Sequence, residues 1–209
     1  TLALVLLMYR RDVAKIVSCL IKGDAKSEDG RLGLLLIVGT IPTILIGLTF
    51  QTILETLFNH LEVVASGFII TGVILCLTKG HEGDRALSLF DSILIGITQG
   101  VAILPGVSRS GSTIGIALLR NVKGEVAVKY SFLLSVPTII GATIIESKNL
   151  YMFSLPPLMI GVFVSMMVGY VSHKILVRIV KARSIHSFAY YCWLIGAAAA
   201  MVVLFNVQL

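Results

Sequence analysis

The stretch PGVSRSGST, residues 105–113, decides the fold because it is polar and lies inside an apolar region. Largely apolar sequence precedes it from Ile93 to Leu104 and follows it from Ile114 to Leu119. Proline and glycine interrupt a helix here, and four hydroxyls and an arginine are costly to bury among apolar groups. Irregular backbone at membrane depth is tolerated only inside protein or beside an aqueous cavity, so this stretch is a candidate site.

The chain has the composition of an integral membrane protein. Of its 209 residues 56% are hydrophobic and 13% charged, and the mean hydropathy is +0.96. A soluble domain of this length needs more polar surface, and the long apolar runs are unlike the short alternating strands of a β-barrel. The net charge of +6 fits basic loops that fix membrane topology, without a nucleic acid partner.

The apolar runs predict an all-α integral membrane fold. Residues 1–9 are expected to be the end of a helix in a chain whose N-terminal part is absent, and 10–31 to be a loop. Residues 51–62 have apolar side chains at helical spacing, which predicts an amphipathic helix at the interface. Five further runs are expected to be membrane helices: 32–50, 63–78, 126–146, 155–177 and 188–207.

The lysines and arginines predict how residues 88–120 lie in the membrane. If this segment enters and returns, four basic segments with six, two, three and four lysines and arginines share one side, and the other side has Lys148 alone. The positive-inside rule favours this arrangement. We therefore predict a re-entrant helix hairpin at 88–120 entering from the cytoplasm, with the basic loops cytoplasmic and the C-terminus outside. The alternative is an interfacial loop between two short helices.

The expected hairpin tip has the chemistry of a phosphate site. Pro105 ends the first half-helix, Gly106 frees the backbone, and the N-terminus of the second half-helix offers unpaired N–H groups to an anion. Arg109 adds a bidentate fork suited to phosphate oxygens. Further hydroxyl donors are present at Ser108, Ser110, Ser112 and Thr113. Gly111 allows the ligand to approach the backbone closely.

Several of these polar residues also have a structural interpretation. Ser112 and Thr113 can cap the helix or bond back to it, and Arg109 can pair with a carboxylate. Gln99 either points at the site or hydrogen-bonds between helices. Asp91, near the hairpin entrance, is expected to be solvated.

Neither the histidines nor the cysteines form a pattern with metal-ligand or disulfide spacing. The sequence therefore predicts no metal site in this chain. The residues concerned are His60, His81, His173, His186, Cys19, Cys76 and Cys192.

The stretch QGVAILPGVSRSGSTI, residues 99–114, closely resembles the second signature of the undecaprenyl-pyrophosphate phosphatases of the BacA/UppP family. The resemblance continues in YSFLLSVPTIIGAT (130–143) and more loosely in LIVGTIPTILIGL (36–48), and it covers essentially the whole chain. It implies a multi-pass plasma membrane hydrolase, associated with bacitracin resistance. Such an enzyme removes the terminal phosphate of a C55 polyprenyl pyrophosphate and so recycles the lipid carrier for cell-wall peptidoglycan synthesis.

The resemblance also implies two inverted repeats within a single membrane domain, 1–209. Residues 1–87 would be the remainder of the first repeat, whose re-entrant hairpin is absent, and 88–209 would be the second. The family's first signature, with a glutamate pair, a proline, two serines and a histidine, does not occur in these 209 residues. By the repeat analogy its glutamates correspond to Gln99 and Ile103, so the chain alone is expected to be inactive.

The resemblance implies that Arg109 holds the pyrophosphate. Arg109 and Ser108 are the two catalytic candidates, and no residue is assigned as the nucleophile. A divalent cation, Mg²⁺ or Ca²⁺, is implied by the family alone. The phosphate-binding candidates are Gly106, Ser108, Arg109, Ser110, Gly111 and Thr113, with Gln99 and Ser112 as further candidates.

The residues leave one other class of protein open and exclude another. A secondary transporter or lipid flippase with a mid-membrane anion site also uses helix ends aimed at an anion. A lipid phosphatase of the phosphatidic-acid type is rejected because no histidine or aspartate follows Arg109 before His173. The expected partners are the polyprenyl pyrophosphate and the membrane, and the sequence indicates no oligomeric state.

Overall fold

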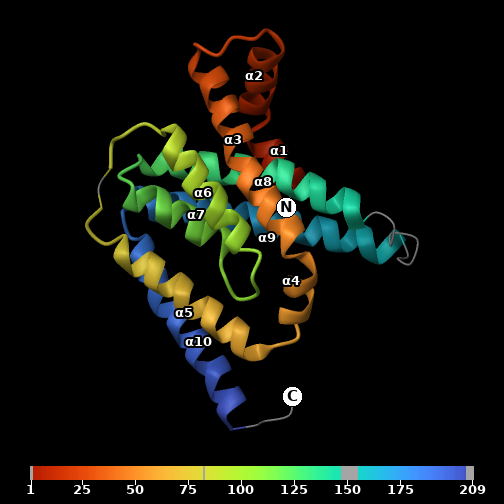
Figure 1. Ribbon diagram of the computed structural model, residues 1–209, viewed down its shortest axis with the longest axis vertical. Coiled ribbons are helices and arrows are strands. Elements are labelled where there is room, and N and C mark those ends of the chain that lie inside the picture. Colours follow the sequence, from red (N-terminus) through yellow and green to blue (C-terminus); the bar gives the residue numbers. More distant parts are fainter. Residues whose placement is uncertain (1, 82, 147–154, 206–209) are drawn as a thin grey trace.

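The computed structural model describes residues 2–81, 83–146 and 155–205, and in them the regular secondary structure is helical, without strands (Figure 1). Four segments are long and apolar enough to cross a membrane: Glu28–Thr49, Gly124–Ile144, Pro157–Lys181 and Ile185–Leu204. The predicted all-α membrane class is confirmed. The helices are α1 (Leu2–Met8), α2 (Arg10–Ile21), α3 (Glu28–Thr49), α4 (Gln51–Leu57), α5 (Leu61–Leu77), α6 (Leu89–Val101), α7 (Arg109–Leu119), α8 (Gly124–Glu146), α9 (Leu155–Lys181) and α10 (Phe188–Leu204).

The predicted membrane helices correspond to α3, α5, α8, α9 and α10. Helix α3 begins four residues earlier than predicted because Ser27 caps it, its Oγ accepting the N–H of Gly30 at 3.2 Å. The predicted interfacial helix at 51–62 is shorter, since α4 ends at Leu57. The last two residues of the prediction 188–207 lie outside the described residues.

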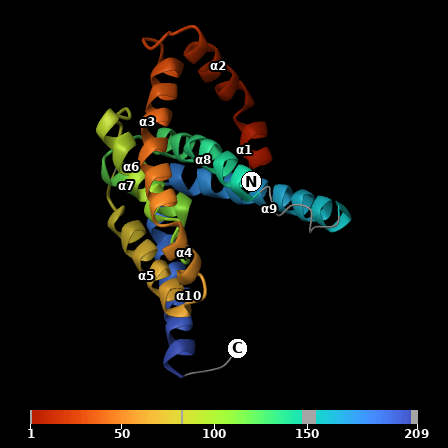
Figure 2. The same ribbon diagram turned by 45° about the vertical axis from the view of Figure 1, so that its right-hand side comes forward.

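The prediction of a loop at 10–31 is wrong over its first half, where the chain forms α2. The many charges of this segment do not prevent a helix, because one face is apolar and buries Ile16. Ile16 and Leu20 pack against Gly33 of α3. Figure 2 shows α2 and α3 joined at the top of the molecule, at the opposite end from α10.

Small residues bring α6 into backbone contact with α3. Gly39 and Gly96 face each other, and Thr43 Oγ1 donates to the carbonyl oxygen of Gly96 at 2.8 Å. Nearby, the hydroxyls of Ser92 and Tyr130 both donate to the carbonyl oxygen of Leu35, at 2.5 and 2.8 Å. Close backbone approach and buried hydrogen bonds are typical of helix packing in membranes. These contacts fix α6 against α3 and α8.

Helices α5 and α10 form a second closely packed pair, which runs side by side in both views (Figures 1 and 2). Gly72 of α5 lies against the ring of Trp193, and Gly196 of α10 lies against Ala65 and Phe68. Figure 2 also shows α9 extending away from the other helices. Most of its apolar side chains are exposed, as expected of a helix surface that contacts lipid. The division into inverted repeats at 87/88 stays a prediction.

Candidate functional site

Helices α6 and α7 form a hairpin whose two ends meet. The backbone N–H of Arg85, before α6, donates to the carbonyl oxygen of Asn121, after α7, at 3.1 Å. The N–H of Lys123 donates to the carbonyl oxygen of Arg85, also at 3.1 Å. The chain therefore enters and leaves this hairpin at the same end, as predicted for 88–120.

Asp91 closes the base of the hairpin. Its carboxylate is fully buried and lies 2.8 Å from Arg85 Nη2 and 3.0 Å from Arg120 Nε, and it also accepts hydrogen bonds from the N–H and Oγ of Ser88. Burial would raise the pKa of Asp91, but the hydrogen bonds from Arg85, Ser88 and Arg120 outweigh it, so the pKa lies well below its usual range. The expectation that Asp91 is solvated is wrong, because two arginines shield it.

The four basic segments lie together at the base of the hairpin. Arg31 Nη2 donates to the carbonyl oxygen of Leu87 at 3.4 Å. A polar cavity of about 350 Å³ is lined by Lys123, Lys181 and Arg183, which come from two further basic segments. The grouping agrees with the charge distribution that predicted the hairpin.

The tip of the hairpin turns at Pro105 and Gly106. Gly106 has a φ of +84°, a backbone conformation that is unfavourable for residues with a side chain. The turn lies on α5, since a side chain at Gly106 would collide with the carbonyl group of Val64. Helix α6 already ends at Val101, four residues before Pro105, so the prediction that Pro105 ends this half-helix is wrong, and Pro105 and Gly106 form the turn that returns the chain into α7.

Ser108 is the N-cap of α7. Its Oγ accepts the N–H of Gly111 at 3.1 Å, and its carbonyl oxygen accepts the N–H of Ser112 at 2.8 Å. The N–H groups of Arg109 and Ser110 have no acceptor within the described part of the chain. Two donors at the positive end of a helix are therefore open to an anion.

Arg109, the first residue of α7, is half-buried. Among the described residues its guanidinium has no carboxylate partner and no hydrogen bond, in contrast to Arg85 and Arg120 at the base. A structural ion pair of Arg109 is thus not found in this part of the chain. An arginine held inside a membrane protein without a partner is suited to bind an anionic ligand.

The other tip residues differ in how their polar groups are used. Thr113 Oγ1 donates to the carbonyl oxygen of Arg109 at 2.8 Å and lies 2.6 Å from Ser131 Oγ of α8. The Thr113 hydroxyl therefore bonds back to its own helix, as the structural interpretation of this residue predicts. Ser112 is buried, and its Oγ has no partner among the described residues. Ser110 and Gly111 are half-buried in the first turn of α7, and their contact with phosphate stays a prediction.

Gln99 hydrogen-bonds between helices. It is fully buried in α6, and its Nε2 donates to Thr138 Oγ1 at 2.8 Å and to the carbonyl oxygen of Leu134 at 3.2 Å, both in α8. Its Oε1 has no partner in the described residues. The amide of Gln99 thus points at α8, and its hydrogen bonds orient α6 relative to α8.

The part of α5 that supports the tip was not predicted from the sequence. Thr71 Oγ1 accepts the N–H of Ser108 at 3.0 Å, and Gly67 lies directly against the backbone of residues 105–107. A glycine and a threonine four residues apart are common in membrane helices, so the pattern does not mark a site by itself.

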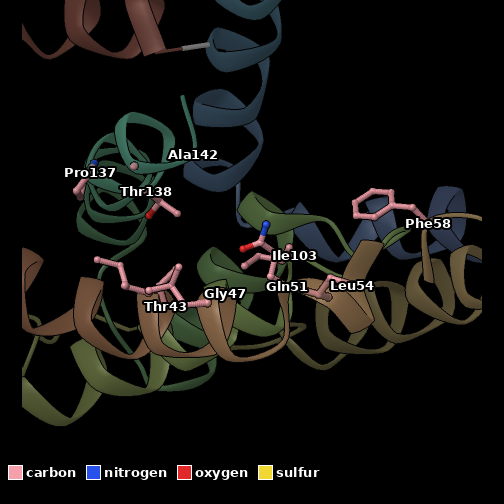
Figure 3. A pocket seen from close by; sticks show the side chains of 12 residues that line it. Thr43, Gly47, Gln51, Leu54, Phe58, Ile103, Pro137, Thr138 and Ala142 are labelled. Atoms are coloured by element: carbon pink, nitrogen blue, oxygen red, sulfur yellow. The ribbon is translucent and has the colours of Figure 1, made fainter. Parts of the chain in front are cut away.

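An apolar cavity of about 390 Å³ lies beside the tip, between α3, α4 and α8 (Figure 3). The hairpin contributes Ile103 to the wall of this cavity. Gly47 of α3 and Gly141 of α8 also line it and, lacking side chains, leave its space open. The remaining wall is mainly aliphatic, with Thr43, Gln51 and Thr138 as polar groups. The cavity is suited to an apolar chain.

The described residues contain no group of three histidines, cysteines, aspartates or glutamates placed to hold a metal ion. The tip itself offers hydroxyls and a guanidinium, whereas Mg²⁺ and Ca²⁺ prefer carboxylate oxygens. These residues do not fit a divalent cation site.

Fold and site together define a helical membrane protein in which the tip of a helix hairpin holds an arginine and two helix N–H groups that have no partner in the described part of the chain. The chain belongs to the BacA family, since the family described as "Bacitracin resistance protein BacA" matches residues 1–198. It is 39% identical to an undecaprenyl-diphosphatase of Carboxydothermus hydrogenoformans over 94% of this chain and 76% of that protein. It is 34% identical to an undecaprenyl-diphosphatase of Korarchaeum cryptofilum, over 95% of this chain and 79% of that protein.

Proposed function

We propose that the protein is a membrane phosphatase that hydrolyses undecaprenyl pyrophosphate to the monophosphate and so regenerates the lipid carrier for cell-wall synthesis. The observation that carries this proposal is the guanidinium of Arg109, which has no partner among the described residues and lies beside the open N–H groups at the start of α7. Membership of the BacA family and the names of the relatives support the same reaction. They do not favour a transporter or flippase.

The reaction breaks a phosphoric anhydride, and negative charge builds up on the departing phosphate oxygen. The N–H groups of Arg109 and Ser110 are held by the first turn of α7 before the substrate binds, so they stabilise this charge without reorganising, and the Arg109 guanidinium adds a positive charge beside them. No carboxylate or histidine pairs with Arg109 in the described part of the chain. We therefore assign residues 105–113 to pyrophosphate binding and charge stabilisation, and not to activation of the attacking oxygen.

The lipid part of the substrate needs an apolar path that starts near the tip. The cavity beside Ile103 meets this requirement, and we assign to it the first isoprene units of the polyprenyl chain. Their burial contributes about 0.8 kcal/mol for each CH₂ group.

The orientation in the membrane follows from the gathered basic segments. We place the base of the hairpin, with Arg85 and Arg120, on the cytoplasmic side of the plasma membrane, because lysine and arginine are enriched in cytoplasmic loops. The C-terminus then lies outside.

Release of phosphate from undecaprenyl pyrophosphate by the purified full-length protein tests this function. We expect Arg109→Ala to lower the turnover by about 100- to 1,000-fold, the usual effect of removing a preorganised donor. Arg178→Ala, which removes an exposed arginine of α9, is the matched control and should leave turnover unchanged. Near-normal turnover of folded Arg109→Ala protein, or lipid translocation by the wild type without phosphate release, would overturn the proposal.

A further inference from the structure

Thr71 lies 34 residues before the proline of PGVSRSGST, yet it contacts the backbone of that motif. It is fully buried in α5, and its Oγ1 accepts the N–H of Ser108 at 3.0 Å. The same hydroxyl donates to the carbonyl oxygen of Gly67 at 2.9 Å. A hydroxyl has a single proton, so donation to Gly67 turns an oxygen lone pair toward Ser108.

Two glycines keep the tip in direct contact with α5. A Cβ atom at Gly67 would lie 2.5 Å from the carbonyl oxygen of Pro105 and 2.8 Å from the nitrogen of Val107. On the other surface, Gly106 lies against the carbonyl group of Val64. Neither surface has room for a side chain, so α5 sets the position of the tip.

Ser108 links the position of the tip to that of the first turn of α7. Its Oγ and carbonyl oxygen hold the N–H groups of Gly111 and Ser112, and Arg109 is the next residue in the chain. The γ-methyl carbon of Thr71 would also lie 3.5 Å from a Cβ atom at Gly111. A shift of the Ser108 backbone therefore moves Arg109 and the free N–H groups together.

We propose that Thr71 is a positioning residue for the reaction: it fixes the Ser108 backbone and thereby the direction in which α7 presents Arg109 to the pyrophosphate. This inference rests on the proposed function of Arg109. Stabilisation by preorganised donors requires correct placement, and a displacement of about 1 Å can cost roughly 100-fold in rate. Thr71 need not touch the substrate to have this effect.

The test compares variants of the full-length protein in phosphate release from undecaprenyl pyrophosphate. Thr71→Val keeps the volume but removes both hydrogen bonds, and we expect kcat to fall about 10- to 100-fold. Thr71→Ser keeps the hydroxyl and should restore kcat to within about 3-fold of the wild type. Thr40→Val is the matched control, because Thr40 is also buried but donates only to Leu36 of its own helix, at 2.7 Å.

Binding of inorganic pyrophosphate, measured by titration calorimetry, separates positioning from general packing. Thr71→Val should weaken this binding about 10-fold in the wild-type background but much less in Arg109→Lys protein, because lysine lacks the bidentate fork. If Thr71→Val does not elute as a folded protein in gel filtration, Thr71→Cys, which is similar in size but a weak acceptor, takes its place.

The outcomes distinguish this inference from the proposed function. Normal kcat and binding in Thr71→Val, with Arg109→Ala inactive, would overturn the role of Thr71 alone. Equal losses in Thr71→Ser or Thr40→Val would also overturn it, since the Thr71 hydroxyl would then not be the cause. Normal turnover of Arg109→Ala would instead overturn the proposed function.

Discussion

Asp91, at the start of the hairpin, and Arg120, just after its end, form an ion pair with 3.0 Å between Oδ1 and Nε. The same carboxylate lies 2.8 Å from Arg85 Nη2, on the segment that leads into α6. One buried carboxylate thus links both ends of the hairpin, and the tip is supported separately by Thr71 of α5. Base and tip are therefore fixed by different parts of the molecule.

We expect Asp91→Asn to destabilise the protein, because it leaves two arginines without their counter-charge. Removing one partner of a buried ion pair costs roughly 3–5 kcal/mol. The side chains of Arg85 and Arg120 keep 41% and 43% exposure, which places the expected loss at the lower end, about 3 kcal/mol. The measurement is the thermal unfolding midpoint of the detergent-solubilised protein.

Glu125→Gln is the control for this substitution. It also removes a carboxylate paired with a cation, Lys181 Nζ at 3.0 Å, but both side chains are more than half exposed. Exposed ion pairs contribute little because water screens them. A midpoint that falls as far in Glu125→Gln as in Asp91→Asn would contradict a special role of Asp91 at the hairpin base.

The contact between α3 and α6 leads to a second prediction, Gly96→Ala. A methyl group at Gly96 would collide with the carbonyl oxygen of Gly39, so α6 must move and the protein should lose about 1–3 kcal/mol. Gly161→Ala, in α9, places the same methyl group where no atom in the described part of the chain lies within 4 Å. Alanine favours a helix over glycine by roughly 0.5–1 kcal/mol, so this control should be neutral or stabilising. Equal unfolding midpoints for the two variants would contradict close packing at Gly96.

Much of the fold could be predicted from the sequence because a membrane limits the choices. A chain in lipid must satisfy its backbone within helices, so apolar runs located α3, α8 and α9 to within a few residues of their ends. The distribution of lysine and arginine then indicated that residues 88–120 return to the side they enter. The bond between Arg85 and Asn121 shows that the two ends of this hairpin meet, whereas the side of the membrane on which they lie stays a prediction.

The parts that could not be predicted depend on contacts between distant segments. Asp91 is buried because Arg85 and Arg120 reach it from both ends of the hairpin, which local sequence does not reveal. Helix α2 was missed because its charges resemble those of a loop, while its stability comes from packing Ile16 on α3. The support of the tip by Thr71 likewise requires α5 to lie beside α7.

The orientation of the hairpin can be measured by labelling single cysteines with a membrane-impermeant reagent, after the three native cysteines are replaced by alanine. Cysteines at Ala86 and Lys123 flank the base but leave the Asp91 ion pairs intact, and both positions are exposed. We expect both to react only from the cytoplasmic side, and a cysteine at Asn59, between α4 and α5, to react from outside. Labelling of positions 86 and 123 from opposite sides would rule out a re-entrant hairpin.

Filling the cavity beside the tip should affect the lipid part of the substrate and leave the phosphate chemistry intact. Gly141 lines this cavity, and no atom of the described residues lies within 4 Å of a Cβ atom placed there, so Gly141→Phe should fold and occupy the space. If the first isoprene units bind in the cavity, the loss of about two buried CH₂ groups, roughly 1.6 kcal/mol, should raise KM for the C55 substrate by about tenfold. The kcat should change little.

Gly161→Phe introduces the same ring on the exposed surface of α9 and should leave KM unchanged, because a Cβ atom there also has no neighbour within 4 Å among the residues that the structure describes. Binding of inorganic pyrophosphate, which has no lipid chain, provides a second comparison and should be equal in wild-type and Gly141→Phe protein. A rise in KM without any loss of pyrophosphate binding would place the polyprenyl chain in this cavity. An unchanged KM in Gly141→Phe would mean that the chain leaves the tip by another path.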